Sequence, residues 1–187
     1  MHNIPITVVD DFLDNPQAFL DLALSCDYAS PKNRAYPGRR TRPLQQTYPQ
    51  YMSYLNRQIA SLFFSDKSNI SVKADSFFYV VDEYKGKGWI HQDWSAMTAI
   101  LYLTDSSDNL NRGTSLFKLK KDKLFLFDNQ KEIEWYDSRF KQFKGENLTK
   151  EEEKIKQDWE DRHFEKVMDI PNKFNRLIIF DPNYFHS

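Results

Sequence analysis

The sequence predicts a mainly β fold that is supported by helices near the N-terminus. The first third of the chain has apolar residues at helical spacing, and short runs of branched and aromatic residues follow from Val72 onward. A strongly charged segment, residues 128–166, interrupts those runs. Strands and helices do not alternate throughout, as a doubly wound parallel sheet would require. We therefore expect an antiparallel sandwich or barrel.

The chain is long enough for one domain with a sizeable core. It has 187 residues, of which 40% are hydrophobic and 16% aromatic, so a folded chain is expected. Residues 1–70 are expected to supply helical support and an arginine-rich loop. Residues 71–187 are expected to form the β core, with the charged helical insertion at 128–166.

The composition argues against several classes of partner. The net charge of -1 gives no basic footprint for nucleic acid or an anionic membrane. No apolar run approaches the ~20 residues that span a bilayer, and the N-terminus lacks the pattern of a secretory signal. Cys26 is the single cysteine, so no internal disulfide can form and a reducing cytoplasm is expected. A metal site would have to be built from histidine and carboxylate.

The N-terminal third is predicted to contain a strand, a helix, a loop and a second helix. The strand covers residues 4–9, and Asn15 followed by Pro16 is typical of a helix start. The apolar face of the first helix is Phe19, Leu22, Ala23 and Cys26. Residues 29–49 are rich in proline and are expected to be a long loop that could bind an acidic substrate group; its arginines are Arg34, Arg39, Arg40 and Arg42. The apolar stripe of the second helix is Met52, Leu55, Ile59, Leu62 and Phe63.

The remainder is predicted to be strands around the charged insertion. The expected strands are residues 72–84, 89–93, 97–103, 114–119, 124–127, 167–170 and 176–180. Thr149 and Glu152 have the spacing of a capping box ahead of a helix that runs to about His163. The apolar face of this helix is thin, mainly Ile155 and Trp159, so we expect the insertion to lie on the surface and His163 to be solvated.

Three residues could hold a metal ion. In a strand, side chains two residues apart point to the same face, so His91 and Asp93 can converge on one ion. His186 follows an apolar strand and a turn, and is expected to supply a third ligand. Two histidines and one carboxylate on one face of an octahedral ion leave three adjacent positions open, which is typical of non-haem iron(II) oxygenases.

The His-x-Asp triplet alone is a weak signal, because roughly 0.4 matches are expected by chance in such a chain. The alternative is a turn in which the aspartate accepts a hydrogen bond and the histidine is merely exposed. The surrounding sequence favours the metal site, because it resembles the prolyl-hydroxylase-like branch of the 2-oxoglutarate/iron(II) dioxygenases. The similar segments, in that family's order, are VVDDFL (8–13), YKGKGWIHQD (84–93), TAILYLT (98–104), GTSLF (113–117), NRLIIFDP (175–182) and HS (186–187). Residues 128–166 have no counterpart.

The resemblance implies a double-stranded β-helix, a jelly roll related to the cupins. It implies an enzyme that uses iron(II) and 2-oxoglutarate to hydroxylate a small molecule or a protein side chain, with release of succinate and carbon dioxide. His91, Asp93 and His186 would be the metal ligands, and Tyr84 and Tyr102 would contact the cosubstrate. For Tyr102, a packed position in the sheet is an equal alternative.

The resemblance also implies a basic residue about ten positions beyond the last histidine, where it would pair with the distal carboxylate of 2-oxoglutarate. The sequence stops at Ser187, so we expect a truncated piece of a longer reading frame. A ligand so close to a chain end is expected to fray.

Two other functions fit the same residues. The first is a zinc-type hydrolase or isomerase that uses the same three ligands. The second is a jelly-roll binding module without catalytic activity.

Overall fold

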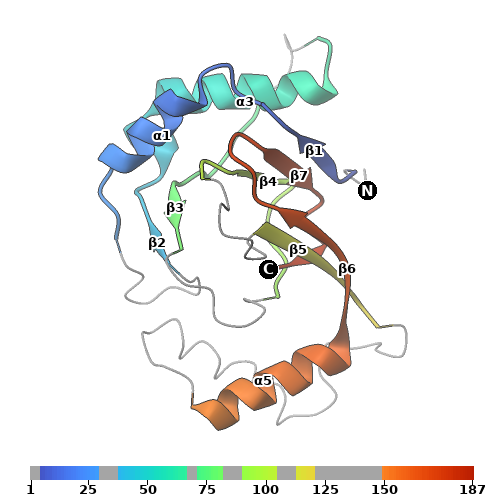
Figure 1. Ribbon diagram of the computed structural model, residues 1–187. Coiled ribbons are helices and arrows are strands. Elements are labelled where there is room, and N and C mark those ends of the chain that lie inside the picture. The colour runs from blue at the N-terminus through green and yellow to red at the C-terminus, as the bar shows by residue number, and fades with distance from the viewer. Residues whose placement is uncertain (1–4, 30–37, 67–70, 82–89, 105–112, 121–148) are drawn as a thin grey trace. The chain divides into compact units, whose positions relative to one another are not determined.

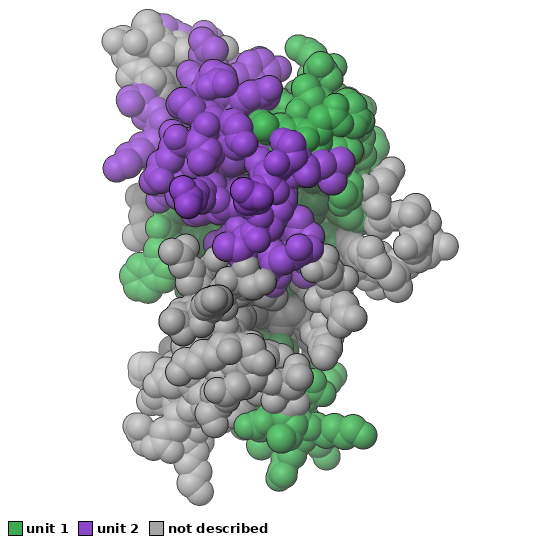
Figure 2. Space-filling model, turned by 90° about the vertical axis from the view of Figure 1, so that its left-hand side faces the viewer, with its two compact units in different colours: residues 1–22, 84–142, 146–187 green, residues 23–83, 143–145 purple. Residues whose placement is uncertain are grey.

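The computed structural model describes residues 5–29, 38–66, 71–81, 90–104, 113–120 and 149–187 (Figure 1). The chain divides into two compact units, which Figure 2 colours separately. Unit 1 comprises residues 1–22, 84–142 and 146–187, and unit 2 comprises residues 23–83 and 143–145. All strand pairs within the described part are antiparallel, and helices accompany them. The prediction of a mainly β fold with N-terminal helices is confirmed at this level.

Unit 1 contains two antiparallel sheets. The first has the order β1-β7-β4, with bounds Thr7–Val9, Leu177–Phe180 and Thr98–Leu101. The second has the order β6-β5-β8, with bounds Phe164–Pro171, Gly113–Leu119 and Phe185–His186. Strand β7 is buried at all four of its positions, which explains why its sequence is a continuous apolar run rather than an alternating one.

The two sheets of unit 1 share a hydrophobic core. The residues at its centre are Leu116 and Ile170 from the second sheet and Ile178 and Phe180 from the first. Along the chain, the connections β4–β5, β6–β7 and β7–β8 each pass from one sheet to the other. Packing between sheets, rather than the strands' short ladders alone, therefore stabilises this unit.

Asn175 links three segments of unit 1 just before β7. It is 5% exposed, and its side-chain amide exchanges two hydrogen bonds of 2.9 Å with the backbone of Leu13. Its backbone N–H donates to the Tyr102 carbonyl, and its carbonyl accepts from the Phe12 N–H. Its φ of 61° is a left-handed conformation that asparagine tolerates better than most residues.

An ion-pair cluster lies beside this link. The Arg176 guanidinium binds both carboxylate oxygens of Asp10, with Nε–Oδ1 and Nη2–Oδ2 distances of 2.6 and 3.0 Å, and Lys173 Nζ lies 3.1 Å from Oδ2. The hydrogen bonds from Arg176, and then from Lys173, lower the pKa of Asp10 from 3.8 to about 2. The folded state therefore prefers the ionised carboxylate more strongly than the unfolded state does.

We predict an acid-dependent stability that depends on Asp10. Because the folded-state pKa is depressed, the contribution is fully present above about pH 4 and is lost as the pH falls towards 2. Asp10→Asn should be less stable than the wild type at pH 7, and the two proteins should become equally stable near pH 2. Urea denaturation across this pH range measures the difference. A difference that stays constant from pH 7 to pH 2 would contradict the prediction.

Helix α5, Lys150–His163, leads directly into β6 (Figure 1), and its last turn packs against residues of the second sheet. The predicted capping box is present, because the Thr149 hydroxyl accepts from the Glu152 N–H and the Glu152 carboxylate accepts from the Thr149 N–H. Trp159 packs on Phe117 and Phe164 and is 1% exposed. His163 is fully buried, and its ring stacks on Trp159 at 4.7 Å.

The expectation that the described part of the insertion, residues 149–166, lies on the surface is therefore wrong for the last turn of α5. Ile155, which was expected on the apolar face, is 45% exposed, whereas His163, which was expected in solvent, is buried. The thin apolar face was misleading because one tryptophan and one stacked histidine supply as much contact area as several aliphatic residues. Residues 128–148 of the insertion lie outside the described part.

Helix α1, Pro16–Ser25, begins where the sequence predicts, with the Asn15 side chain accepting from the Ala18 N–H. In unit 2, helix α3 covers Pro49–Phe63. Met52 is buried as expected, but Leu62 and Phe63 at the end of the predicted stripe are 39% and 37% exposed.

Residues 29–49 are not one loop, which corrects the prediction. Strand β2, Arg39–Arg40, pairs with β3, Tyr79–Val80, and helix α2 covers Leu44–Thr47. The Arg40 guanidinium lies 4.8 Å from the centre of the Tyr79 ring, where it makes a cation–π contact. Only Tyr79–Val80 of the strand predicted at 72–84 forms within the described residues.

The predicted strand at 89–93 is reduced to an isolated bridge at His91, and the one at 124–127 lies outside the described part. The other predicted strands correspond to β4, β5, β6 and β7. No helix in the described ranges combines the length and the apolar character needed to cross a bilayer.

Candidate metal centre

Two segments of unit 1 that are far apart in the sequence pair at His91 and His186. Each of these residues donates its backbone N–H to the carbonyl of the other, at 2.9 and 2.8 Å. Two residues further on, the Asp93 N–H donates to the Pro182 carbonyl at 3.2 Å, and the Gln92 side chain donates to the Asn183 carbonyl at 2.6 Å. These bonds fix the chain segment that carries His91 and Asp93 against the segment that carries His186.

His186 is held on both sides despite its position in the sequence. It lies on β8 opposite Leu116 of β5, and Ser187 and Ser115 exchange backbone hydrogen bonds of 3.0 and 3.1 Å. On the other side it pairs with His91. Strand β8 is thus hydrogen-bonded to a neighbour along each edge, an arrangement that opposes the fraying expected from the sequence.

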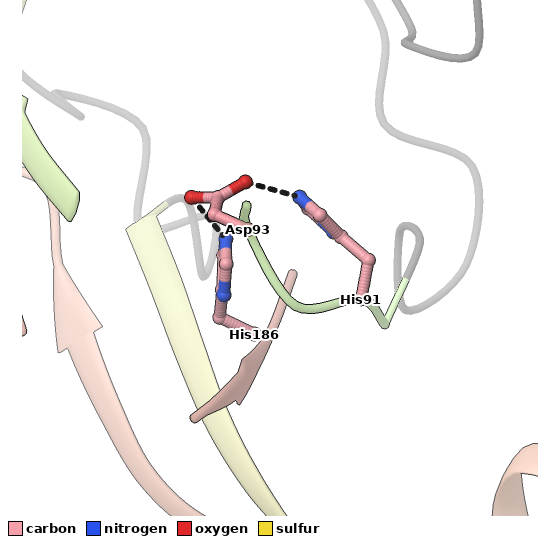
Figure 3. Close-up of side chains that lie close together, drawn as sticks. All are labelled: His91, Asp93 and His186. Carbon is pink, nitrogen blue, oxygen red and sulfur yellow. Dashed lines mark ion pairs between the residues drawn. The ribbon is translucent and has the colours of Figure 1, made fainter. Parts of the chain in front are cut away.

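The structure brings His91, Asp93 and His186 together (Figure 3). The Asp93 carboxylate contacts both imidazoles, whose ring centroids are 4.2 Å apart, with His91 Nε2 at 3.6 Å from Oδ1 and His186 Nε2 at 3.4 Å from Oδ2. One donor atom from each residue can be chosen so that all three lie within 4.8 Å of one another. It is the only such group of potential ligands found among the described residues.

These donor atoms fit a divalent transition-metal ion. Nitrogen and oxygen ligands lie about 2.1 Å from such an ion, so two ligands at adjacent octahedral positions are about 3 Å apart. The two separations between Asp93 and the histidines, 3.4 and 3.6 Å, are close to this value, and all three donor atoms lie within 4.8 Å of one another, so the side chains would draw together around a bound ion. Imidazole and carboxylate together suit iron(II) and zinc better than calcium or magnesium, which prefer oxygen ligands alone.

Hydrogen bonding and packing orient the His186 ring. Its Nδ1 lies 3.1 Å from the Tyr184 carbonyl, which can only accept, so Nδ1 carries a proton and Nε2 is the nitrogen that faces Asp93. The Phe180 ring packs edge-on at 4.9 Å between centroids. The His186 side chain is 5% exposed, whereas those of His91 and Asp93 are 28% and 35% exposed, so the cluster is open to solvent on one side.

The environment of Asp93 favours its ionised form. Burial alone would raise the pKa of this carboxyl group, but hydrogen bonds from His186, His91 and Thr98 outweigh burial and hold the pKa far below its ordinary value. At neutral pH the site therefore presents an anionic oxygen ligand beside two imidazoles.

The two tyrosines predicted to contact a cosubstrate cannot both be placed. Tyr84 lies outside the described residues. The Tyr102 hydroxyl is 2.7 Å from Thr114 Oγ1, and its ring packs against the core that the two sheets share. Tyr102 follows Thr98 by four residues. Because side chains in extended chain alternate between the two faces of a sheet, Tyr102 points to the same face as Thr98, about 13 Å further along the strand direction. Its contact with a cosubstrate stays a prediction.

Thr98 is a site residue that the sequence analysis missed. Its hydroxyl donates to Asp93 Oδ2 at 2.6 Å, which makes it a direct neighbour of the ligand cluster. The pattern assigned it only to a strand. One signal was available in the sequence. Thr98 is a hydroxyl residue at the start of the predicted strand, five positions after Asp93, and a short turn between the two could bring its hydroxyl back to the carboxylate.

Fold and site together define an antiparallel β protein with a cluster of two histidines and one aspartate. The chain belongs to the family described as "Family of unknown function (DUF6445)", whose sequence model matches residues 1–187. No curated protein and no solved structure matches the chain. The family description names no activity, so an argument about function has to start from the site.

Proposed function

We propose that this protein is an iron(II)- and 2-oxoglutarate-dependent dioxygenase that hydroxylates a small molecule or a protein side chain. The observation that carries the proposal is the convergence of His91, Asp93 and His186, with donor atoms within 4.8 Å of one another. A metal held by three ligands on one face keeps three further positions for a chelating cosubstrate and dioxygen. In the balanced reaction, substrate C–H, dioxygen and 2-oxoglutarate give substrate C–OH, succinate and carbon dioxide.

The arrangement of strands supports the accompanying fold proposal, a double-stranded β-helix or cupin-like jelly roll. Two antiparallel sheets share one core, and the connections β4–β5, β6–β7 and β7–β8 pass from one sheet to the other. That alternation is expected of a jelly roll. The resemblance of residues 84–93 and 175–182 to the prolyl-hydroxylase-like branch points the same way.

Each residue of the cluster has a distinct task in this proposal. When bound, iron would supply the activation of oxygen that is coupled to decarboxylation of 2-oxoglutarate. His91, Asp93 and His186 would hold it, and the Tyr184 carbonyl keeps His186 in the tautomer that can ligate through Nε2. Phe180 covers His186 on one side, while the exposed edges of His91 and Asp93 leave an approach for substrate. Since Cys26 is the single cysteine, we place this reaction in the reducing cytoplasm.

The test is cosubstrate turnover by the purified chain. Protein prepared without metal would be loaded with iron(II) under nitrogen and then given 2-oxoglutarate and air, with succinate measured by mass spectrometry and oxygen by an electrode. We expect succinate that depends on both iron and 2-oxoglutarate, and none from an Asp93→Asn variant. Tight metal binding without succinate or oxygen uptake would instead support the zinc-type hydrolase or isomerase. An absence of metal binding would support a non-catalytic module.

A further inference from the structure

Thr98 occupies a fixed position beside the ligand cluster. It is the first residue of β4 and lies opposite Phe180 in the ladder with β7, and the Phe180 ring contacts His186. The turn that separates it from Asp93 is closed by a hydrogen bond from the Ser95 hydroxyl to the Met97 carbonyl at 3.1 Å. The backbone of Thr98 is therefore set by the sheet rather than by the loop that carries Asp93.

The hydrogen bond from Thr98 distinguishes the two oxygens of Asp93. The hydroxyl donates to Oδ2 at 2.6 Å, a short bond of the kind that a charged acceptor makes. Oδ1 faces His91 Nε2 at 3.6 Å, and within the described part of the chain no hydroxyl donates to it. Each oxygen therefore faces one imidazole, Oδ1 that of His91 and Oδ2 that of His186 at 3.4 Å, and among the described residues only Oδ2 also accepts a hydroxyl hydrogen bond.

We propose that Thr98 is a positioning residue of the metal centre, which holds Oδ2 of Asp93 so that the carboxylate offers one oxygen, Oδ1, to the ion. The proposal rests on the proposed metal site, but not on the identity of the cosubstrate or substrate. A carboxylate that binds through one oxygen takes one coordination position, whereas one that binds through both takes two. Thr98 therefore helps to keep the third open position available for ligands other than protein.

The test compares metal binding by the wild type and three variants of the full chain. Thr98→Val keeps the shape of the side chain but removes the hydroxyl, and Thr98→Ser keeps the hydroxyl. Thr114→Val is the matched control, because it removes the hydroxyl of a buried sheet threonine that bonds Tyr102 rather than Asp93. The probe is Mn(II) alone, with affinity measured by isothermal titration calorimetry and bound exchangeable water measured by proton relaxation.

Thr98→Val should bind Mn(II) about 10- to 100-fold more weakly than the wild type, as expected when a group that orients a ligand is lost. The released carboxylate can then turn both oxygens to the ion, so this variant should also carry one fewer exchangeable water on Mn(II). Thr98→Ser and Thr114→Val should match the wild type in both measurements. If Thr98→Val does not fold, Thr98→Ala set against Thr98→Ser gives the same comparison.

Two results overturn the role of Thr98 while leaving the metal site standing. One is a Thr98→Val variant with wild-type affinity and water number, and the other is a Thr98→Ser variant that binds as weakly as Thr98→Val, since the hydroxyl would then not matter. A wild-type chain that binds no divalent transition metal overturns both this inference and the proposed function. The two failures are therefore distinguishable.

Discussion

Replacing Asp93 with asparagine is expected to weaken the binding of iron(II) or Mn(II) at least a hundredfold without unfolding the protein. The amide has nearly the shape of the carboxylate and can still accept the Thr98 hydrogen bond, so the local structure should persist. It lacks the negative charge that the surroundings of Asp93 favour in the wild type. Four ligands of structural zinc sites together supply roughly 10–16 kcal/mol, so one ligand corresponds to about 3 kcal/mol, or slightly more than a factor of one hundred.

The measurement is the metal dissociation constant of metal-free protein, with folding checked by circular dichroism. Asp169→Asn is the matched control, because it removes one carboxylate charge from unit 1 at a surface ion pair with Lys166. It should bind metal as the wild type does. Equal affinities of Asp93→Asn and the wild type would mean that Asp93 is not a ligand, and the proposed site would fail with it.

The sequence predicted which three residues come together in the candidate site, but the local structure that brings them together differs from the one expected. A regular strand at 89–93 was expected to direct His91 and Asp93 to one face. The structure instead has one bridge at His91, and the Asp93 backbone bonds to Pro182. The convergence therefore depends on pairing with a segment some ninety residues away, which no local pattern encodes. His186 was inferred from its position after an apolar strand and a turn, and the resemblance gave it the same role.

Long-range contacts also explain the predictions that were wrong. Strand β2 exists because Arg39 and Arg40 pair with Val80 and Tyr79, and Ala29 pairs with Arg40 in turn. A stretch rich in proline and arginine looks like a loop when its partner strand is unknown. The burial of α5 was missed for a related reason: the periodicity of its apolar residues is weak, and a single large side chain makes the contact.

Trp159→Ala is expected to destabilise the protein by about 3–5 kcal/mol, the range for truncating a large buried aromatic side chain. Trp159 is 1% exposed and packs on Phe117 and Phe164. The ring centroids of Trp159 and Phe164 are 5.6 Å apart. The truncation would leave a cavity on the face of the second sheet opposite the shared core. The small stability of a typical domain, about 5–15 kcal/mol, makes such a loss a large fraction of the total.

Trp94→Ala provides the control, because Trp94 is 104% exposed and its removal should change the free energy of unfolding by no more than about 0.5 kcal/mol. Urea denaturation followed by circular dichroism measures both variants without relying on tryptophan fluorescence, which each of them alters. The effect of Trp159→Ala should extend to the metal centre, since Phe164 also contacts Phe185, the residue before His186 on β8. A Trp159→Ala variant as stable as Trp94→Ala would mean that α5 does not pack on the sheet, and that the surface position predicted from its sequence was right.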